Sequence, residues 1–554
     1  MKLPKRDIEE FAIEIIDNCN VSRSQRISNN QLWTSLYFTG AANNESEQAI
    51  YNKTYTHIEE TNSMIYSPSD VRFNLIFDHT TAANYIARAK TAAQYLTRAF
   101  ADADCDIAFG EAVLWGLIKG STFIKGLWGA EGLDPYVIQP EYMGVLNESI
   151  PGLDRQEAFC HTTFLSPAQV RRLIAEHPEK DKIMKDVEGM KSAGQSDEER
   201  EENFFHQIVI GGTNPVATTG PTSPAGGVVG VNNGPISQIS PEVAAELVRL
   251  DEIWVLDDDR EDYTTVQMLA KQVCIEGKLE RRNLCGLKGE HPFRQVMPEP
   301  MANYFWGRSA IAGVMGLQTL LNQRLRDFNR IWKLQARSPK AYIGFSGMTP
   351  EKHRKLNAPG GYISEDTPNG KVEDLAPKLP EGAFDELLET LQFFDDMSGS
   401  KPIMKGKGEG SVRSGSHAQT LLRSAAGRIR DRALLIERQL EDFGDLSFKY
   451  LQAKTAEKFK SDKGEDFLLA QMPDDYRVKV DSHSASPAFS EDAKELAFEL
   501  AKAGAIGPAE LIMLTNPPQQ DMLLAAVKEK QAAEAKFLQE HPEAAQQSKG
   551  GKKR

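Results

Sequence analysis

The most constraining feature of this chain is a long row of apolar residues that begins just past its middle. The members of the row recur every three or four residues, as on one face of a helix, and are Ile311, Val314, Gln318, Leu321, Leu325, Phe328 and Trp332. Ser309 is a suitable N-cap, and Pro339 disfavours a helical conformation at Ser338. The pattern predicts a helix over residues 309–336, roughly 40 Å long.

A compact β unit is predicted next, over residues 337–382. Residues 341–345 have the pattern of a strand, and residues 362–364 and 371–373 flank a turn. The turn is Asn369-Gly370, a dipeptide typical of hairpins because both positions favour positive φ. We therefore expect an exposed hairpin between the two helices that surround it.

A second helix is predicted over residues 383–398, with Gly399 as its end. Its apolar face holds Phe384, Leu387, Leu388, Leu391 and Phe394. The glycine-rich loop that follows, residues 399–416, is expected to be mobile and carries Lys401, Lys405, Lys407 and Arg413. A helical pattern then runs over residues 417–455, and at that length we expect it to bend, with Gly427 and Gly444 as candidate hinges.

The remainder of the chain mixes both kinds of element and predicts an α+β fold. Helices are predicted at 7–16, 81–104, 106–118 and 490–540, and strands at 122–128, 136–138, 159–164, 253–256, 266–275 and 476–480. Residues 212–240 are rich in Gly, Pro, Thr, Ser and Asn and predict a flexible surface insertion. Residues 548–554 are basic and are predicted to form a disordered tail.

Opposite charges distinguish the two shorter predicted helices. The first carries Arg324, Arg326, Arg330, Lys333 and Arg337 against one acid, Asp327. The second carries only acids, namely Asp385, Glu386, Glu389, Asp395 and Asp396. Antiparallel packing within one subunit explains this pattern, and so does packing between neighbouring copies in a ring.

Bulk composition limits the partners that we expect. A chain of 554 residues predicts two to four structural units. The formal net charge of −14 argues against a large basic face that grips DNA, although DNA could still slide past an acidic wall. The five cysteines are widely spaced and predict neither disulfides nor a zinc site. No apolar run approaches the length of a membrane span, so we expect no membrane partner.

Motifs for chemistry are weak throughout. The loop 406–411 has glycines and a lysine but lacks the Gly-Lys-Ser/Thr of a phosphate-binding loop. The acidic run 257–262 lacks the glycine and glutamate of a calcium loop, which favours a solvated turn. His291, before Pro292, is interpreted as a structural histidine. We expect no catalytic residues, no metal and no cofactor.

Short motifs around the helical region follow one another in a characteristic order. They are Glu290-His291-Pro292-Phe293, Phe305-Trp306-Gly307-Arg308-Ser309, Leu317-Gln318 with Asn322, Ala336-Arg337-Ser338-Pro339, Asn357-Ala358-Pro359-Gly360-Gly361, Ser398-Gly399 and Ser414-Gly415. In order and spacing they resemble the portal (head-to-tail connector) proteins of tailed bacteriophages, chiefly over residues 290–455. Residues 134–145 and 252–254 are more loosely similar to the wing of that family.

The resemblance implies a portal-type subunit with named parts. These are an α/β wing (1–308, with the insertion 212–240), a first stem helix (309–336), a small β clip (337–382), a second stem helix (383–398), a tunnel loop (399–416), a long bent helix that returns to the wing (417–484), an α-helical crown (485–547) and the basic tail (548–554).

The resemblance also implies a function. Twelve copies would form a ring at one capsid vertex of the virion, after synthesis in the host cytoplasm. Double-stranded viral DNA would pass through the channel during packaging, retention and ejection, and the basic tunnel-loop residues would touch its phosphates. The clip would dock the terminase large subunit and then the head–tail adaptor, and the wing would face capsid and scaffold proteins. The ATPase would belong to terminase.

Two other readings stay open at this stage. The first is a capsid or tail structural protein without a DNA channel. The second is an enzyme, although the sequence lacks the phosphate-binding loop or carboxylate cluster that a terminase or nuclease requires. For the tunnel loop, the alternative is a solvated segment with no partner.

Overall fold

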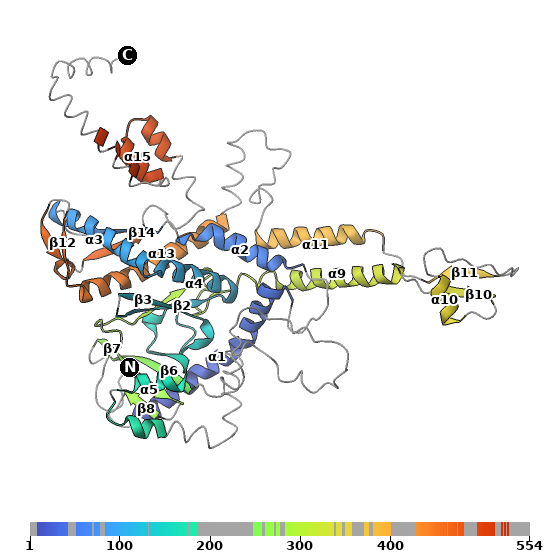
Figure 1. Cartoon of the computed structure of the whole chain (residues 1–554), viewed down its shortest axis with the longest axis horizontal. Helices are drawn as coiled ribbons and strands as arrows, with labels where there is room; N and C mark the ends of the chain where they lie inside the picture. Colours follow the sequence, from blue (N-terminus) through green and yellow to red (C-terminus); the bar gives the residue numbers. More distant parts are fainter. Residues whose placement is uncertain are drawn as a thin grey trace, which may run out of the picture.

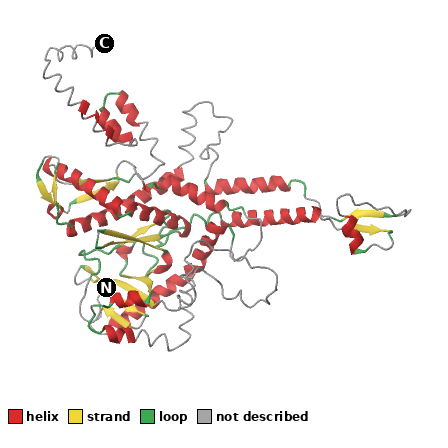
Figure 2. Cartoon of the chain, viewed as in Figure 1, coloured by secondary structure: helices red, strands yellow, loops and turns green. Residues whose placement is uncertain are grey.

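The computed structural model has an α+β fold with a body, a projecting arm and a small tip (Figures 1 and 2). The structure describes residues 8–41, 51–68, 71–77, 83–130, 132–175, 177–185, 248–257, 261–270, 273–276, 283–336, 340–345, 349–356, 370–375, 380–399, 427–461, 464–473, 475–480, 496–515, 522–523, 526–527 and 529–530. The insertion 212–240, the loop residues 400–416 and the tail 548–554 therefore lie outside the described residues.

Two antiparallel sheets form much of the body. The larger has the order β4 (Met143–Val145), β5 (Ala158–Leu165), β6 (Val248–Asp257), β7 (Asp262–Leu269) and β8 (Val273–Glu276). The smaller has the order β3 (Leu133–Ile138), β2 (Thr122–Trp128) and β9 (Phe293–Val296). An aromatic core fills the space beside them, with Trp254, Phe159 and Phe293 fully buried.

Helices cover these sheets and build a second core. They are α1 (Ile8–Thr39), α2 (Lys53–Ile65), α3 (Ala83–Asp102), α4 (Cys105–Lys119), the short α5 (Pro167–Leu173) and the long α13 (Gly427–Lys454). Two small strand pairs join them, β1 (Phe73–Phe77) with β14 (Tyr476–Val480), and β12 (Lys458–Lys460) with β13 (Asp466–Leu468). Three single-turn helices, η2 (Pro140–Tyr142), η3 (Leu153–Arg155) and η6 (Leu469–Gln471), lie in the connections.

The arm consists of α9 (Met315–Ala336) and α11 (Ala383–Ser398), which lie side by side and project from the body (Figure 1). The tip at its far end holds β10 (Lys340–Ile343), α10 (Pro350–Leu356) and β11 (Lys371–Asp374). Near the C-terminus, α15 (Pro508–Thr515) lies apart from the body. No helix among the described residues is long and apolar enough to cross a membrane.

Several element boundaries confirm the sequence analysis. The second arm helix ends at Ser398 as predicted, and Gly399 closes it in a left-handed conformation with φ of 78°. The strands at 122–128, 159–164 and 476–480 are present. In the crown segment 485–547, Gly504 follows one helical piece and Pro508 begins α15; the described residues 522–523, 526–527 and 529–530 are also helical.

The first arm helix begins later than predicted. Residues 309–314 form turns, and the regular helix starts at Met315. Ser309 therefore lies six residues before the helix; its hydroxyl donates to the Ile118 carbonyl of α4, 2.5 Å away, and accepts from the Ile311 backbone N–H at 3.1 Å, within the turns. Tertiary contacts with α4 therefore override the local helical pattern at this end.

The predicted tip also needs correction. Strand β11 confirms the prediction at 371–373, and its antiparallel partner in the structure is β10, with Tyr342 opposite Val372. The prediction had placed residues 362–364 in that role, and they lie outside the described residues, as does Asn369. Helix α10 was not predicted, so the clip is not purely β.

One further prediction was wrong in the body. The predicted strand 266–275 is two strands, β7 and β8, because the chain turns at Ala270, where φ is 49°. Helix α13 is continuous through Gly444, one of the two candidate hinges. A Cβ at Gly444 would lie 2.6 Å from the Phe73 ring, so this glycine permits close packing against β1.

Candidate functional site

The arm is an antiparallel helix pair that extends from the body. Helix α9 has 22 residues and α11 has 16, which gives lengths of about 33 Å and 24 Å. Near the tip, the rings of Phe328 and Phe384 lie 5.1 Å apart, and Arg324 forms an ion pair with Glu386. Nearer the body, Phe394 is fully buried. The hairpin is therefore packed along most of α11.

The predicted charged residues of the arm differ in their exposure and in their partners. Arg324 and Glu386 pair across the two helices, and both side chains remain about half exposed. An exposed pair of this kind contributes at most about 1 kcal/mol. The others that lie exposed on the arm surface are Arg330 and Lys333 on α9 and Asp385, Glu389 and Asp396 on α11. Arg326 is half-buried.

Asp395 has a partner that the sequence analysis did not predict. Its carboxylate forms an ion pair with Lys53 of α2, with 2.6 Å between Nζ and Oδ1. The same ammonium donates to the Leu391 carbonyl at 3.4 Å and lies 5.5 Å from the centroid of the Phe394 ring. Lys53 therefore fastens the base of α11 to the body.

The base of α9 is fastened by two buried amides. Gln318 and Asn322 lie four residues apart, and their side chains are essentially fully buried. Gln318 bonds to the start of α2, and Asn322 donates to the Gly40 carbonyl at the end of α1, at 2.6 Å. The sequence analysis counted Gln318 in the apolar row and did not predict this role.

The segment that leads into the arm is held against α4. Gly307 donates its backbone N–H to the Ser121 hydroxyl, and Ala310 donates to the Leu117 carbonyl, at 2.8 and 2.9 Å. A Cβ at Gly307 would lie 2.2 Å from the Gly120 carbonyl oxygen, so only glycine fits this backbone crossing. The arm therefore starts from a backbone with little freedom to shift.

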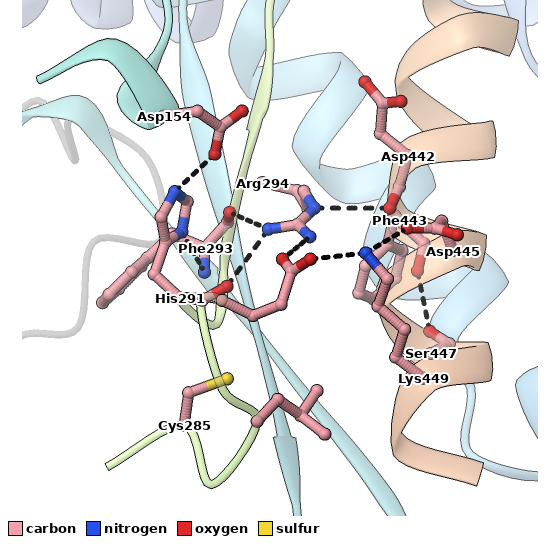
Figure 3. Close-up of polar contacts among 12 residues, drawn as sticks. Asp154, Cys285, His291, Phe293, Arg294, Asp442, Phe443, Asp445, Ser447 and Lys449 are labelled. Atoms are coloured by element: carbon pink, nitrogen blue, oxygen red, sulfur yellow. Dashed lines mark hydrogen bonds and ion pairs between the residues drawn. The ribbon is translucent and has the colours of Figure 1, made fainter. Parts of the chain in front are cut away.

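A polar network in the body joins β9 to α13 (Figure 3). Arg294 contacts Glu290 at 2.9 Å and donates to the Asp442 carbonyl at 3.3 Å. Lys449 of α13 pairs with Glu290 and with Asp445. Burial raises the pKa of Glu290, but its hydrogen bond from Lys449 and the charge of Arg294 outweigh this and leave the pKa lowered.

His291 belongs to the same network and has a structural role. Its Nε2 lies 2.8 Å from the Asp154 carboxylate, and its Nδ1 accepts from the Phe293 backbone N–H. Burial lowers the pKa of His291, while the contact with Asp154 opposes that shift. Both ring nitrogens are thus engaged in holding the turn before β9, in agreement with the sequence interpretation.

The two ends of the acidic run 257–262 are not freely solvated, whereas Glu261 is exposed and residues 258–260 lie outside the described part of the chain. Asp257 is fully buried at the end of β6. Asp262 faces it across the β6–β7 pair and accepts hydrogen bonds from Asn283 and Gly289, each at 2.8 Å. The described residues contain no cluster of His, Cys, Asp or Glu that could hold a metal ion.

The arm exposes large apolar side chains on more than one face. More than half of each side chain is exposed for Trp332, Phe384, Leu388, Phe393 and Met397. The helical period places Phe384 and Leu388 on one side of the buried Thr390–Phe394 row, and Phe393 and Met397 on the other. Helix α11 therefore presents an apolar flank on each side.

The tip is exposed and carries both charge and apolar surface. Ile343, Val372 and Leu375 are exposed hydrophobics. Helix α10 adds exposed Lys352, Arg354 and Lys355. Gly370, from the predicted turn, is exposed just before β11.

The predicted DNA-contacting residues cannot be placed on the arm. They lie in the tunnel loop, outside the described part of the chain, and are Lys401, Lys405, Lys407 and Arg413. The described residues nearest to this loop on either side are Gly399, just after α11, and Gly427, at the start of α13.

Comparison with known proteins adds no relative to this description. A scan against protein-family models and a search of curated proteins each return no match for this chain.

Proposed function

We propose that this chain is a portal-type subunit, which assembles into a ring around a DNA channel at one capsid vertex. The observation that carries the proposal is the projecting arm, with apolar flanks on both sides of α11 and opposite charge on its two helices. Exposed large apolar side chains grouped along a helix flank suit contact with another protein. Flanks on two sides of one helix suit a subunit with a neighbour on each side, as in a heterologous ring.

Charge supports the same arrangement. The exposed acids of α11, Asp385, Glu389 and Asp396, share the face that the helical period turns away from the buried Phe394. In the proposed ring this row lines the channel. A wall of like charge repels DNA phosphates and allows the duplex to slide, whereas basic side chains on the tunnel loop would contact it.

The tip supplies the proposed docking surface for the packaging motor and then for the head–tail adaptor. It lies at the far end of the arm from the body, where a second protein has free access (Figure 1). Exposed Ile343 and Leu375 beside the basic helix α10 provide both apolar area and charge for such a contact. In this arrangement the chain itself carries no ATPase, which belongs to the terminase.

Electron microscopy of the purified protein tests the proposal directly. Negative-stain images should show closed rings with a central hole. Shells, tubes or dispersed monomers would refute the portal function, and shells or tubes would favour a capsid or tail protein without a channel. An ATPase assay of the purified rings should show no turnover, whereas robust hydrolysis would point to an enzyme.

A further inference from the structure

Helix α9 extends past the start of α11 toward the tip (Figure 1). The contacts across the arm fix this offset, since Arg324 pairs with Glu386 and Phe328 lies against Phe384, the second residue of α11. These pairs run in opposite directions along the chain, so the two helices are antiparallel. Residues 329–336 of α9, about 12 Å of helix, therefore lie beyond the start of α11. We call this stretch the uncovered end of α9.

The apolar row of α9 continues into its uncovered end. Leu325, Phe328 and Trp332 follow one another at helical spacing and so lie on one face. Leu325 and Phe328 lie within the reach of α11 and are partly buried. Trp332 is 65% exposed, more than any other large apolar side chain described on the two arm helices. The row therefore presents an indole ring just past the point where α11 begins.

The uncovered end of α9 is also basic, whereas α11 is acidic. It carries exposed Arg330 and Lys333, and it includes no Asp or Glu. Steps of about 100° per residue place Lys333 beside Trp332 and place Arg330 on the opposite side of the helix. Within the arm, α11 supplies an acid to a cation of α9, as in the pair of Arg324 with Glu386. An occupant that continues this packing needs an acidic side chain next to its apolar ones.

An exposed tryptophan beside a cation has the character of an interface anchor. Tryptophan is enriched among the few residues that carry most of the binding energy of an interface. Burial of one aromatic side chain removes about 150–250 Å² from water. A surface of two helical turns is nevertheless small, so the contact that it makes is weak and reversible. Reversibility suits a site that the packaging motor leaves before the head–tail adaptor binds.

From this geometry we propose that the uncovered end of α9 binds an acidic amphipathic helix of the protein that docks at the tip. That helix extends the antiparallel pair beyond α11, with its apolar face on Trp332 and an acid against Lys333. The inference deepens the proposed function and rests on it, because a second protein must dock at this end of the arm.

Fluorescence anisotropy with a defined peptide tests the inference on the full-length protein. The probe is a labelled peptide with the sequence of residues 383–398, which is acidic and packs against α9 in the arm. Trp332→Ser removes the ring, and Leu334→Ser is the matched control, because Leu334 is an exposed apolar residue on the opposite side of the same two turns. We expect Trp332→Ser to weaken binding at least ~10-fold and Leu334→Ser less than ~2-fold.

A second matched pair of variants tests the charge. Lys333→Gln should weaken binding of the peptide about 3-fold at low salt and reduce its salt dependence. Arg330→Gln should do neither, because Arg330 lies on the side of the helix away from Trp332. A peptide whose acids are all replaced by amides should bind equally to wild type and to the Lys333→Gln protein.

Three results would overturn the inference. One is equal binding of the peptide to the Trp332→Ser and Leu334→Ser proteins, or no binding to wild type. Another is displacement of the peptide by short duplex DNA whose own binding depends on Trp332, which would assign the surface to nucleic acid. The third is loss of rings in Trp332→Ser in electron micrographs, which would place Trp332 between copies. If wild type itself forms no rings, the proposed function fails, and the dependence on Trp332 still decides whether this surface binds the helix.

Discussion

Removal of the Asp395 charge should loosen the base of α11. Lys53 is 11% exposed and Asp395 is 30% exposed, so Asp395→Asn leaves a mostly buried ammonium beside a neutral amide. The expected cost lies between that of a broken surface pair and that of a fully buried one, and we place it at about 1–2 kcal/mol. Because the other contacts of Lys53 persist, we expect local opening and not global unfolding.

Hydrogen exchange of the α11 amides measures this effect. A loss of about 1–2 kcal/mol accelerates exchange from the locally opened state by about 5- to 30-fold. Glu386→Gln is the control, because its pair with Arg324 is about half exposed and should change exchange by about 2-fold. Equal acceleration in both variants, or none in Asp395→Asn, would refute the assignment of Lys53 as the anchor.

Three other perturbations test separate parts of the proposal. Replacing exposed Asp385 and Glu389 together by Lys reverses the charge of the proposed channel wall and should slow the release of DNA from packaged particles, most strongly at low salt. Unchanged release would argue against an acidic channel wall. Alanine at the basic residues of loop 399–416 should flatten the salt dependence of DNA retention and leave rings intact, and a loss of rings would count against a DNA role. Burial lowers the pKa of His161 and of His291, so the unfolded chain binds protons that the folded chain does not. Thermal stability should therefore fall as the pH drops through 6.5, and this fall should be smaller in His161→Gln than in the wild type.

The reversal of Asp395 and Asp396, which the sequence alone suggests as a test of assembly, is unsuitable. It would remove the pair between Lys53 and Asp395 within one subunit as well as any contact between copies. Asp385 and Glu389 are exposed on the same helix, so their reversal leaves the pair between Lys53 and Asp395 intact. The structure thus changes which acids of α11 can be reversed without loosening the base of the arm.

Local signals in the sequence predicted the helices and strands better than they predicted which of these elements pack or pair with each other. Gly399 ends α11 because a glycine adopts positive φ without a steric penalty, and that preference is visible in the sequence. The start of α9 was misplaced because Ser309 bonds to α4, far away in the chain. The pairing of β10 with β11 was missed for a similar reason, since a strand pattern does not specify its partner.

The buried amides Gln318 and Asn322 show how a local inconsistency in the sequence can mark a structural role. In the predicted apolar row Val314 precedes Gln318 and Leu321 follows it, and Asn322 comes one residue after Leu321. A buried amide costs stability unless every donor and acceptor is satisfied, so a helix face that retains two of them requires nearby partners. Those partners are the ends of α1 and α2, which no periodicity in the sequence identifies. The polar interruption was therefore visible beforehand, but its meaning for the orientation of the arm depended on the three-dimensional arrangement of three helices.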